Sequence, residues 1–306
     1  MCDDGVIPTL RGAFEATGSP SWVMRTIQSQ GLDRRHGFRL ELVLGNDRIK
    51  HSFQATETVL AEGLADFIDT DWVSIARCRQ QGLDFVGVFP YGRIMGGVVV
   101  PTSSDIDDLA DLRGRRIGVV RALDKNWSVV RAVCLNRHGF DLQHSAVVEE
   151  AGSKTALVAQ LQSGQVDAAV LYWHLVPPLT VSGRFRQLCD VLDLLPELEP
   201  AAAPTTFFAF RDQFVADNPG LIQTFIAAYR DAVALMHADA TLWPPMEAEL
   251  LAALRAAWTR RISTGCSASD MSALGRLFDR LKAIGGEACV GVVAIPPGTF
   301  APAFMS

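Results

Sequence analysis

The chain has 306 residues, of which 49% are hydrophobic and 20% are charged. This length exceeds what one hydrophobic core usually reaches and predicts two lobes of roughly 100 to 200 residues each, while the composition excludes a disordered or fibrous chain. The net charge is −6, and Lys and Arg form no run that could neutralise a row of phosphates, so the sequence disfavours a nucleic-acid partner.

Helical and strand patterns alternate from the start of the chain in a βαβ rhythm, which is typical of parallel sheets with crossover helices. The first α/β run reads as helix, strand, helix, strand, helix and strand over residues 21–30, 39–44, 57–62, 65–69, 74–80 and 85–89.

A second α/β run begins near residue 98, with a helix-entry signal at Ser104 and Asp105. Its elements read as strand, helix, strand, helix and strand over residues 116–121, 127–137, 145–149, 154–162 and 167–172. The C-terminal part then continues with a strand, a long helix and further helical stretches over residues 206–210, 219–237 and up to about 282.

Pro and Gly punctuation near residues 90–92 and again near Pro196 predicts two crossings of the chain between lobes, and two crossings make a hinge. We therefore expect an α/β fold of two doubly wound lobes with a cleft between them. Lobe 1 takes residues 1–95 and 196–306, including the C-terminal helices, and lobe 2 takes residues 96–195.

Apolar stretches such as residues 117–120 and 168–173 are far shorter than the ~20 residues of a membrane helix. The first five residues lack the basic and apolar regions of a secretory signal. Two readings remain: a cytoplasmic protein, or a periplasmic protein whose signal has been removed. The second is our expectation, on the family resemblance given below.

The cysteines show no CxxC pair and no metal-ligand spacing, which disfavours a zinc or redox site. Two of them, Cys266 and Cys289, lie on either side of one predicted helix, so a disulfide and a pair of buried free thiols are both open. The six cysteines are Cys2, Cys78, Cys134, Cys189, Cys266 and Cys289.

Four segments resemble the nitrate/sulfonate/taurine-type solute-binding proteins of ABC importers. They are residues 31–43 (GLDRRHGFRLELV), 61–68 (AEGLADFI), 106–120 (IDDLADLRGRRIGVV) and 161–170 (LQSGQVDAAV). The resemblance implies the type II periplasmic binding protein fold, with a small organic anion bound between the lobes and an ABC permease as partner. It also implies a monomer that binds its ligand without catalysis, metal or resident cofactor.

A narrower resemblance concerns members of this family encoded beside quinoprotein alcohol dehydrogenases, including a periplasmic protein that binds pyrroloquinoline quinone (PQQ). It rests on two short tracts, residues 121–127 (RALDKNW) and 168–174 (AAVLYWH). It implies PQQ as the bound ligand.

Three tryptophans, Trp72, Trp127 and Trp173, fall where predicted strands give way to helices. Their flat rings can stack on a planar conjugated ligand, although a core position is the ordinary alternative for a Trp. Lys125 lies two residues before Trp127, with Arg121 at the end of the preceding strand, and they can offer an ammonium and a guanidinium to a ligand anion. A solvated loop is the alternative for Lys125.

Further candidates come from helix starts and from neighbours of the tryptophans. The loop at 17–22 resembles the first cleft loop of the family, where small residues open a helix, but simple N-capping explains it equally well. The other candidates can donate to a ligand or complement its charge, and each has a structural alternative. The remaining candidates are Ser19, Ser21, Trp22, Asp71, Arg93, Ser128, Tyr172 and His174.

Two other functions compete with solute binding. An enzyme on the same fold is one, because related scaffolds host a desulfinase with a cleft Cys, a thiamine-pyrimidine synthase with a Cys-rich motif and menaquinone-pathway enzymes. The first cleft loop offers Thr17, Gly18 and Ser19 but no Cys, and the cysteines are not clustered. A protein that delivers a cofactor to a dehydrogenase is the other.

Overall fold

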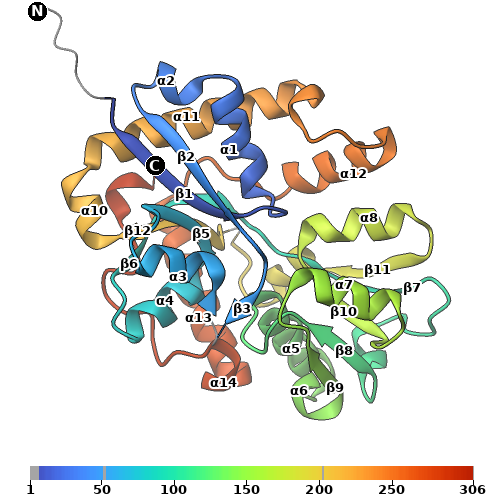
Figure 1. Ribbon diagram of the computed structural model, residues 1–306. Coiled ribbons are helices and arrows are strands. Elements are labelled where there is room, and N and C mark those ends of the chain that lie inside the picture. Colours follow the sequence, from blue (N-terminus) through green and yellow to red (C-terminus); the bar gives the residue numbers. More distant parts are fainter. Residues whose placement is uncertain (1–6, 51–52, 202, 306) are drawn as a thin grey trace, which may run out of the picture.

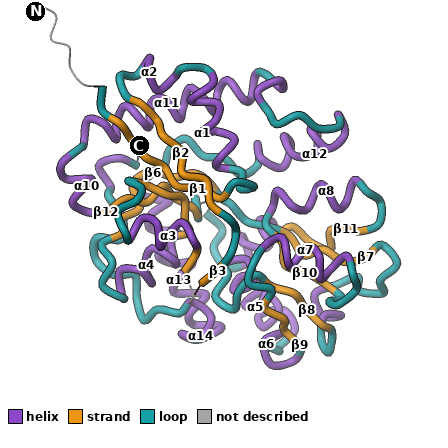
Figure 2. The backbone as a smooth tube through the Cα atoms, in the orientation of Figure 1, coloured by secondary structure: helices purple, strands orange, loops and turns teal. Residues whose placement is uncertain are grey.

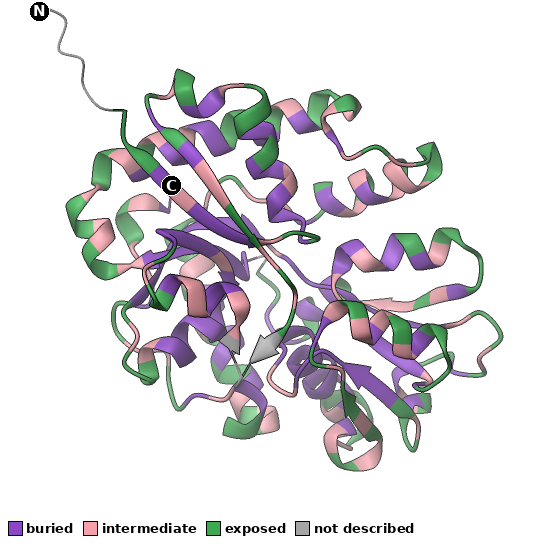
Figure 3. Cartoon of the chain, in the orientation of Figure 1, coloured by how far each residue is buried: buried purple, intermediate pink, exposed green. Residues whose placement is uncertain are grey.

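The computed structural model describes residues 7–50, 53–201 and 203–305 and forms two α/β lobes, each built on one five-stranded sheet (Figure 1). Helices flank the sheets in both lobes (Figure 2). The strands are largely buried and the helices turn their exposed residues outward (Figure 3). No helix in the described part of the chain has the length and apolarity needed to span a bilayer.

The first sheet has the strand order β2-β1-β5-β12-β6. Its strands are β1 (Thr9–Glu15), β2 (Arg39–Gly45), β5 (Phe67–Asp71), β6 (Phe85–Gly92) and β12 (Thr206–Arg211). The helices that connect them in sequence are α1 (Pro20–Ser29), α2 (Leu32–Arg35), α3 (Ala55–Ala61) and α4 (Trp72–Gln80), with the short strands β3 (Ile49–Lys50) and β4 (Phe53–Gln54) before α3.

The second sheet has the strand order β11-β7-β10-β8-β9. Its strands are β7 (Gly97–Pro101), β8 (Arg116–Val119), β9 (Val147–Glu150), β10 (Ala168–Leu171) and β11 (Phe185–Asp190). Its helices are α5 (Lys125–His138), α6 (Leu142–Ser145), α7 (Lys154–Gln162), α8 (Val176–Val181) and α9 (Val191–Leu194).

Each sheet contains one strand that runs against both of its neighbours, which differs from the parallel sheets that the βαβ rhythm predicts. β12 is antiparallel to β5 and β6, and β7 is antiparallel to β10 and β11. Both are the first strand after the chain crosses from the other lobe. Such a strand starts at the cleft, where the parallel strands end, so it must run in the opposite direction.

The C-terminal helices contact both lobes. α10 (Asp212–Asp217) and α11 (Pro219–Ala238) lie with the first lobe, where α11 packs on α1. α12 (Ala248–Thr259) contacts α8, and α13 (Ala268–Gly285), followed by α14 (Glu287–Val290), packs on α5 of the second lobe. α12 also packs on the first lobe, since its buried Leu254 and Trp258 share a core cluster with α11, so the assignment of these helices to lobe 1 stays a prediction. The residue boundaries of the lobes stay a prediction.

Glycines allow the backbones to approach closely at the first crossing between the lobes. A Cβ atom on Gly96 would lie 1.7 Å from the carbonyl oxygen of Leu171, and one on Gly92 would lie 2.1 Å from that of Arg261. The Gly96 N–H donates to Asn126 Oδ1 at 2.8 Å. Only glycine fits at these two positions.

Two local features differ from the sequence predictions, and one open alternative is decided. No helix begins at Ser104 or Asp105; the chain forms a 3₁₀ turn, Leu109–Leu112, which Asp108 caps by accepting from the Ala110 N–H at 2.9 Å. The strands β1 and β11 are absent from the predicted elements. Cys266 and Cys289 flank α13 as predicted, and both are buried free thiols.

Candidate functional site

A cavity of about 40 Å³ lies between the lobes, where the ends of β1, β5 and β10 meet the first turns of α1, α5 and α7. Cavities at this edge are the usual ligand sites of open α/β sheets. The first lobe and its crossing strand line it with Glu15, Gly18, Ser19, Pro20, Gln54, Thr56, Asp69, Thr70, Asp71, Ile94 and Thr206. The second lobe lines it with Lys125, Lys154, Tyr172, Trp173 and His174.

The second lobe contributes two ammonium groups. Lys125, the first residue of α5, is 7% exposed and donates from Nζ to Thr206 Oγ1 at 3.0 Å. Burial lowers the pKa of Lys125, and the carboxylates of Asp71, Asp124 and Asp69 act in the opposite direction. The second ammonium group belongs to Lys154, the first residue of α7.

Lys154 begins α7 and forms an ion pair with Glu15 of β1, so this contact joins the two lobes. Its Nζ atom also lies 4.2 Å from the centroid of the Tyr172 ring, a cation–π geometry. The Tyr172 hydroxyl donates to Asp124 Oδ2 at 2.7 Å. The ion pair with Glu15 and the contact with the Tyr172 ring together hold the Lys154 ammonium in the cavity lining.

The first lobe contributes carboxylates, of which Asp71 is the N-cap of α4. Its oxygens accept from the backbone N–H and the hydroxyl of Ser74, each at 2.8 Å, and its Oδ2 lies 3.8 Å from Arg121 Nη2. Burial opposes the ionisation of Asp71, but the charges of Lys125, Arg77 and Arg121 hold its pKa below the usual range. Asp71 is therefore ionised and already bonded.

Asp69, two residues earlier on β5, is in a different state. Among the described residues its carboxyl group has no hydrogen-bond or ion-pair partner in a side chain, although it lines the cavity. Burial raises the pKa of Asp69 to about 6, against the opposing charge of Lys154. This carboxyl is the free acidic group of the site.

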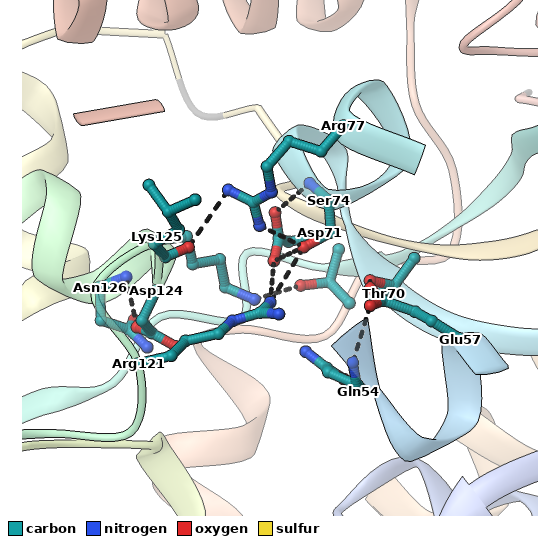
Figure 4. A network of polar contacts seen from close by, with 12 residues as sticks. Gln54, Glu57, Thr70, Asp71, Ser74, Arg77, Arg121, Asp124, Lys125 and Asn126 are labelled. Carbon is teal, nitrogen blue, oxygen red and sulfur yellow. Dashed lines mark hydrogen bonds and ion pairs between the residues drawn. The ribbon is translucent and has the colours of Figure 1, made fainter. Parts of the chain in front are cut away.

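Behind the cavity wall, a buried polar network connects the lobes (Figure 4). Arg121, which follows β8, donates to Ser74 Oγ of the first lobe at 3.1 Å. Arg77 donates to the same hydroxyl at 2.7 Å and to the carbonyl oxygens of Leu123 and Val290, both at 3.2 Å. These bonds hold the wall of the cavity in place.

Three other lining residues hold buried polar atoms without a hydrogen-bond partner within the described residues: Thr56 Oγ1, Trp173 Nε1 and His174 Nε2. Their exposed fractions are 3%, 2% and 7%. Burial lowers the pKa of His174 to about 3, so its imidazole is neutral. Buried polar groups normally have partners, and a bound molecule in the cavity can supply them.

Six of the predicted site residues line the cavity. Ser19 does so and accepts from the Tyr91 hydroxyl at 3.1 Å. The others were predicted from strand ends and helix starts, which is where the structure brings them together. They are Asp71, Lys125, Tyr172, Trp173 and His174.

Trp72 and Trp127 require a correction, because both lie fully buried in the hydrophobic core. Trp127 Nε1 donates to Gln143 Oε1 at 3.0 Å. Each stands in the first turn of its helix, as predicted, but its side chain faces the core. A strand-to-helix junction fixes the position of the backbone at the cleft edge and leaves the direction of each side chain open. Neither ring can stack on a ligand in this cavity.

Five further predicted residues lie outside the cavity lining. Ser21 bonds to the Gly18 carbonyl at 2.7 Å, and Trp22 packs edge-on against Trp173 with centroids 5.9 Å apart. Arg93 donates to the carbonyl of Arg260 at 3.3 Å.

The other two predicted residues of this group support the cavity from behind. Arg121 belongs to the buried network just described. Ser128 donates to the carbonyl of Cys289 at 2.6 Å and so holds α14 against α5. Arg121 ties the segment before α5 to α4, and Ser128 ties α5 to α14.

The sequence predictions missed seven polar lining residues: Glu15, Gln54, Thr56, Asp69, Thr70, Lys154 and Thr206. Asp69 and Lys154 carry the signal used for the others, since one ends the predicted strand 65–69 and the other begins the predicted helix 154–162. Glu15 ends β1, a strand that the sequence pattern does not reveal.

Comparison with known proteins gives one family and many similar structures. The family model described as NMT1/THI5 like matches residues 30–241, and no curated protein matches the chain. The alkanesulfonate-binding protein SsuA from Xanthomonas axonopodis pv. citri bound to MOPS has a TM-score of 0.70 and 18% identity, covering 92% of this chain and 96% of that chain.

Two other solved structures also resemble this chain. The periplasmic aliphatic sulphonate binding protein SsuA from Escherichia coli has a TM-score of 0.68 and 17% identity, covering 89% of this chain and 85% of that chain. The desulfurization enzyme DSZB has a TM-score of 0.59 and 16% identity, covering 95% and 97%. At these identities the likeness is one of fold, and the fold is that of periplasmic binding proteins.

Proposed function

The chain belongs to the NMT1/THI5-like family, and from that membership and the cleft we propose that it is a solute-binding protein of an ABC importer. In this proposal it captures a small organic molecule with an anionic group in the periplasm and, as a monomer, passes it to the permease. The sulfonate-binding proteins with the same fold support the proposal.

One observation carries it: the cavity is lined by charged groups from both lobes, and neither lobe completes it alone. Lys125 and Lys154 come from the second lobe, and Asp69, Asp71 and Glu15 come from the first. A solute that contacts both walls stabilises the closed arrangement, because it binds that arrangement more tightly than the open one. Capture by closure is what a solute-binding protein does.

PQQ is the finer version of this proposal. Its support is Trp173, whose indole lines the cavity on the same side as Lys125. The other two indoles lie in the core, and a cavity of about 40 Å³ is far smaller than the roughly 150 Å³ cavity that takes up benzene. A tricyclic tricarboxylate requires open lobes, so the geometry favours a more compact solute than PQQ.

An enzyme is the second candidate function, because DSZB shares the fold. A nucleophilic cysteine in the cavity would favour it. Among the residues that line the described cavity there is no cysteine. Burial raises the pKa of Cys78 and Cys266 elsewhere in the chain, to about 12 for Cys266, which suppresses the reactive thiolate. The arrangement favours binding over cysteine catalysis.

Titration of the purified protein with short carboxylates, alkanesulfonates and PQQ tests the proposal, with intrinsic Trp fluorescence and the melting temperature as readouts. We expect one-to-one saturation with at least one acid and loss of that response in Lys125→Ala. The control is Arg35→Ala in α2, which is remote from the cavity and should bind normally. Saturation by none of these compounds contradicts the proposal.

A further inference from the structure

Two opposite charges face the same cavity without pairing with each other. Asp69 lines it from β5 and Lys125 from α5, yet within the described residues they form no ion pair. The other charges of the lining are engaged, since Lys154 pairs with Glu15 and Asp71 accepts two hydrogen bonds from Ser74. The cavity therefore has one open negative pole in the first lobe and one open positive pole in the second.

We propose that the solute is a compact zwitterion, whose cationic nitrogen binds Asp69 of the first lobe while its anionic group binds Lys125 of the second. This inference rests on the proposed function and names the chemical class of its ligand. It also fixes the orientation of the ligand across the cleft, with one end on each lobe.

An anion without a cationic nitrogen is disfavoured in this cavity, because the first lobe lines it with carboxyl groups. Three carboxyl groups, Glu15, Asp69 and Asp71, line the cavity against the two ammonium groups of Lys125 and Lys154. An added carboxylate or sulfonate would neutralise Lys125 and leave Asp69 as a partly buried acid beside a like charge, which disfavours binding. A protonated amine removes that cost by pairing with Asp69.

The Lys125 end of the cavity is equipped for an anion. The ammonium group has three N–H donors, and the contact to Thr206 Oγ1 uses one of them. Trp173 of the second lobe also lines the cavity, and its Nε1 is a buried donor without a partner among the described residues. A carboxylate or sulfonate has enough lone pairs to accept from both groups.

The size of the cavity limits the spacer between the two charged groups. A volume of about 40 Å³ is enough for about three water-sized groups. Two charged groups joined by a chain of two carbons require little further opening, whereas a ring system requires the lobes to separate. The ligand therefore belongs to the short amino acids and aminosulfonates rather than to the aromatic acids.

The test uses two pairs of probes in which an ammonium group replaces a hydroxyl at constant size. The pairs are β-alanine with 3-hydroxypropionate and 2-aminoethanesulfonate with 2-hydroxyethanesulfonate, titrated calorimetrically at neutral pH. We expect the amine of at least one pair to bind about tenfold or more tightly than its hydroxyl partner. In Asp69→Asn this preference falls to about one.

Asp231→Asn is the matched control, because Asp231 is an exposed carboxylate paired with His36 on α11. It should retain the preference for the amine. Melting curves check that both variants are folded, which is expected for Asp69→Asn because the change is isosteric and breaks no bond to another side chain.

Three results overturn the inference: equal or tighter binding of the hydroxyl compounds, an amine preference that survives in Asp69→Asn, or binding restricted to acids without nitrogen. Each of these leaves the proposed function intact, because a solute still binds. Absence of binding by every probe and by every acid of the wider titration overturns the proposed function together with the inference. The two failures are therefore distinguishable.

Discussion

The ammonium group of Lys154 is ion-paired with the carboxylate of Glu15, and this pair joins the two lobes beside the cavity that both residues line. Their side chains are only 12% and 11% exposed. The next residue, Thr155, donates its backbone N–H and its hydroxyl to Asp47 Oδ2 at 2.8 and 2.9 Å. The first turn of α7 is thus held by the first lobe through two neighbouring contacts, which close the cleft in this structure.

Removing one partner of the pair should open the cleft. In Glu15→Gln the Lys154 ammonium keeps its charge in a partly buried place without its partner, which is costly. We expect a larger radius of gyration by small-angle X-ray scattering in the absence of solute. A double-mutant cycle with Lys154→Met should give a coupling energy of about 1–2 kcal/mol in urea unfolding. A coupling near zero would show that the contact contributes nothing to the closed state.

Asp69 should make the stability of the protein depend on pH in an unusual direction. Its pKa is about 6 in the folded protein and about 4 in an unfolded chain. Between these values the folded state binds more protons than the unfolded state, so the free energy of unfolding falls as the pH rises. The charged groups that act on it are Lys154, Glu15 and Lys125.

Asp69→Asn should therefore raise the free energy of unfolding by about 1–3 kcal/mol near pH 7.5 and change it little near pH 4.5. Urea denaturation at both pH values measures the difference. Asp231→Asn serves as the exposed control and should show no such dependence. A stabilisation of equal size at both pH values would mean that the ionised form of Asp69 is not disfavoured in the folded protein.

Most of the fold follows from local patterns. The helix predicted over 154–162 is α7 itself, and Gly139 ends α5 in a left-handed conformation with φ of 75°. β1 escapes prediction because Gly12 interrupts its apolar alternation. That glycine is required by packing, since a Cβ atom there would lie 2.6 Å from the Phe14 ring. The need for glycine at this position comes from tertiary packing, which the local sequence pattern does not show.

The site is less predictable, because a strand end fixes where a residue lies and not where its side chain points. Trp173 and Trp127 both follow a predicted strand end, yet Trp173 lines the cavity and Trp127 lies in the core, where its Nε1 donates outward to the half-buried Gln143. Pairings between lobes, such as Lys154 with Glu15, join residues 139 apart in the sequence. No local sequence pattern predicts such pairings.

Substitution of Trp173, and not of Trp127, should affect solute binding, because only Trp173 lines the cavity. Trp127→Phe removes core volume and the bond to Gln143, so it should lower the free energy of unfolding by about 1–3 kcal/mol and leave solute affinity unchanged. Trp173→Phe removes the unpartnered Nε1 donor at the cavity and should weaken solute binding as well as stability, because this indole is also buried. Urea unfolding and calorimetric titration separate the effects. Loss of affinity in Trp127→Phe alone would contradict the assignment.

The crossing between the lobes should not tolerate a side chain at Gly96. A Cβ atom there would lie 1.7 Å from the Leu171 carbonyl oxygen, so Gly96→Ala must displace the crossing strand from β10. We expect a loss of about 3 kcal/mol or more in the free energy of unfolding, together with a weaker response to solute. Gly220→Ala in α11 is the matched control, because no atom lies within 4 Å of its Cβ position and alanine favours a helix. If Gly96→Ala is as stable as this control, the lobes cross with more freedom than the close approach of Gly96 to Leu171 implies.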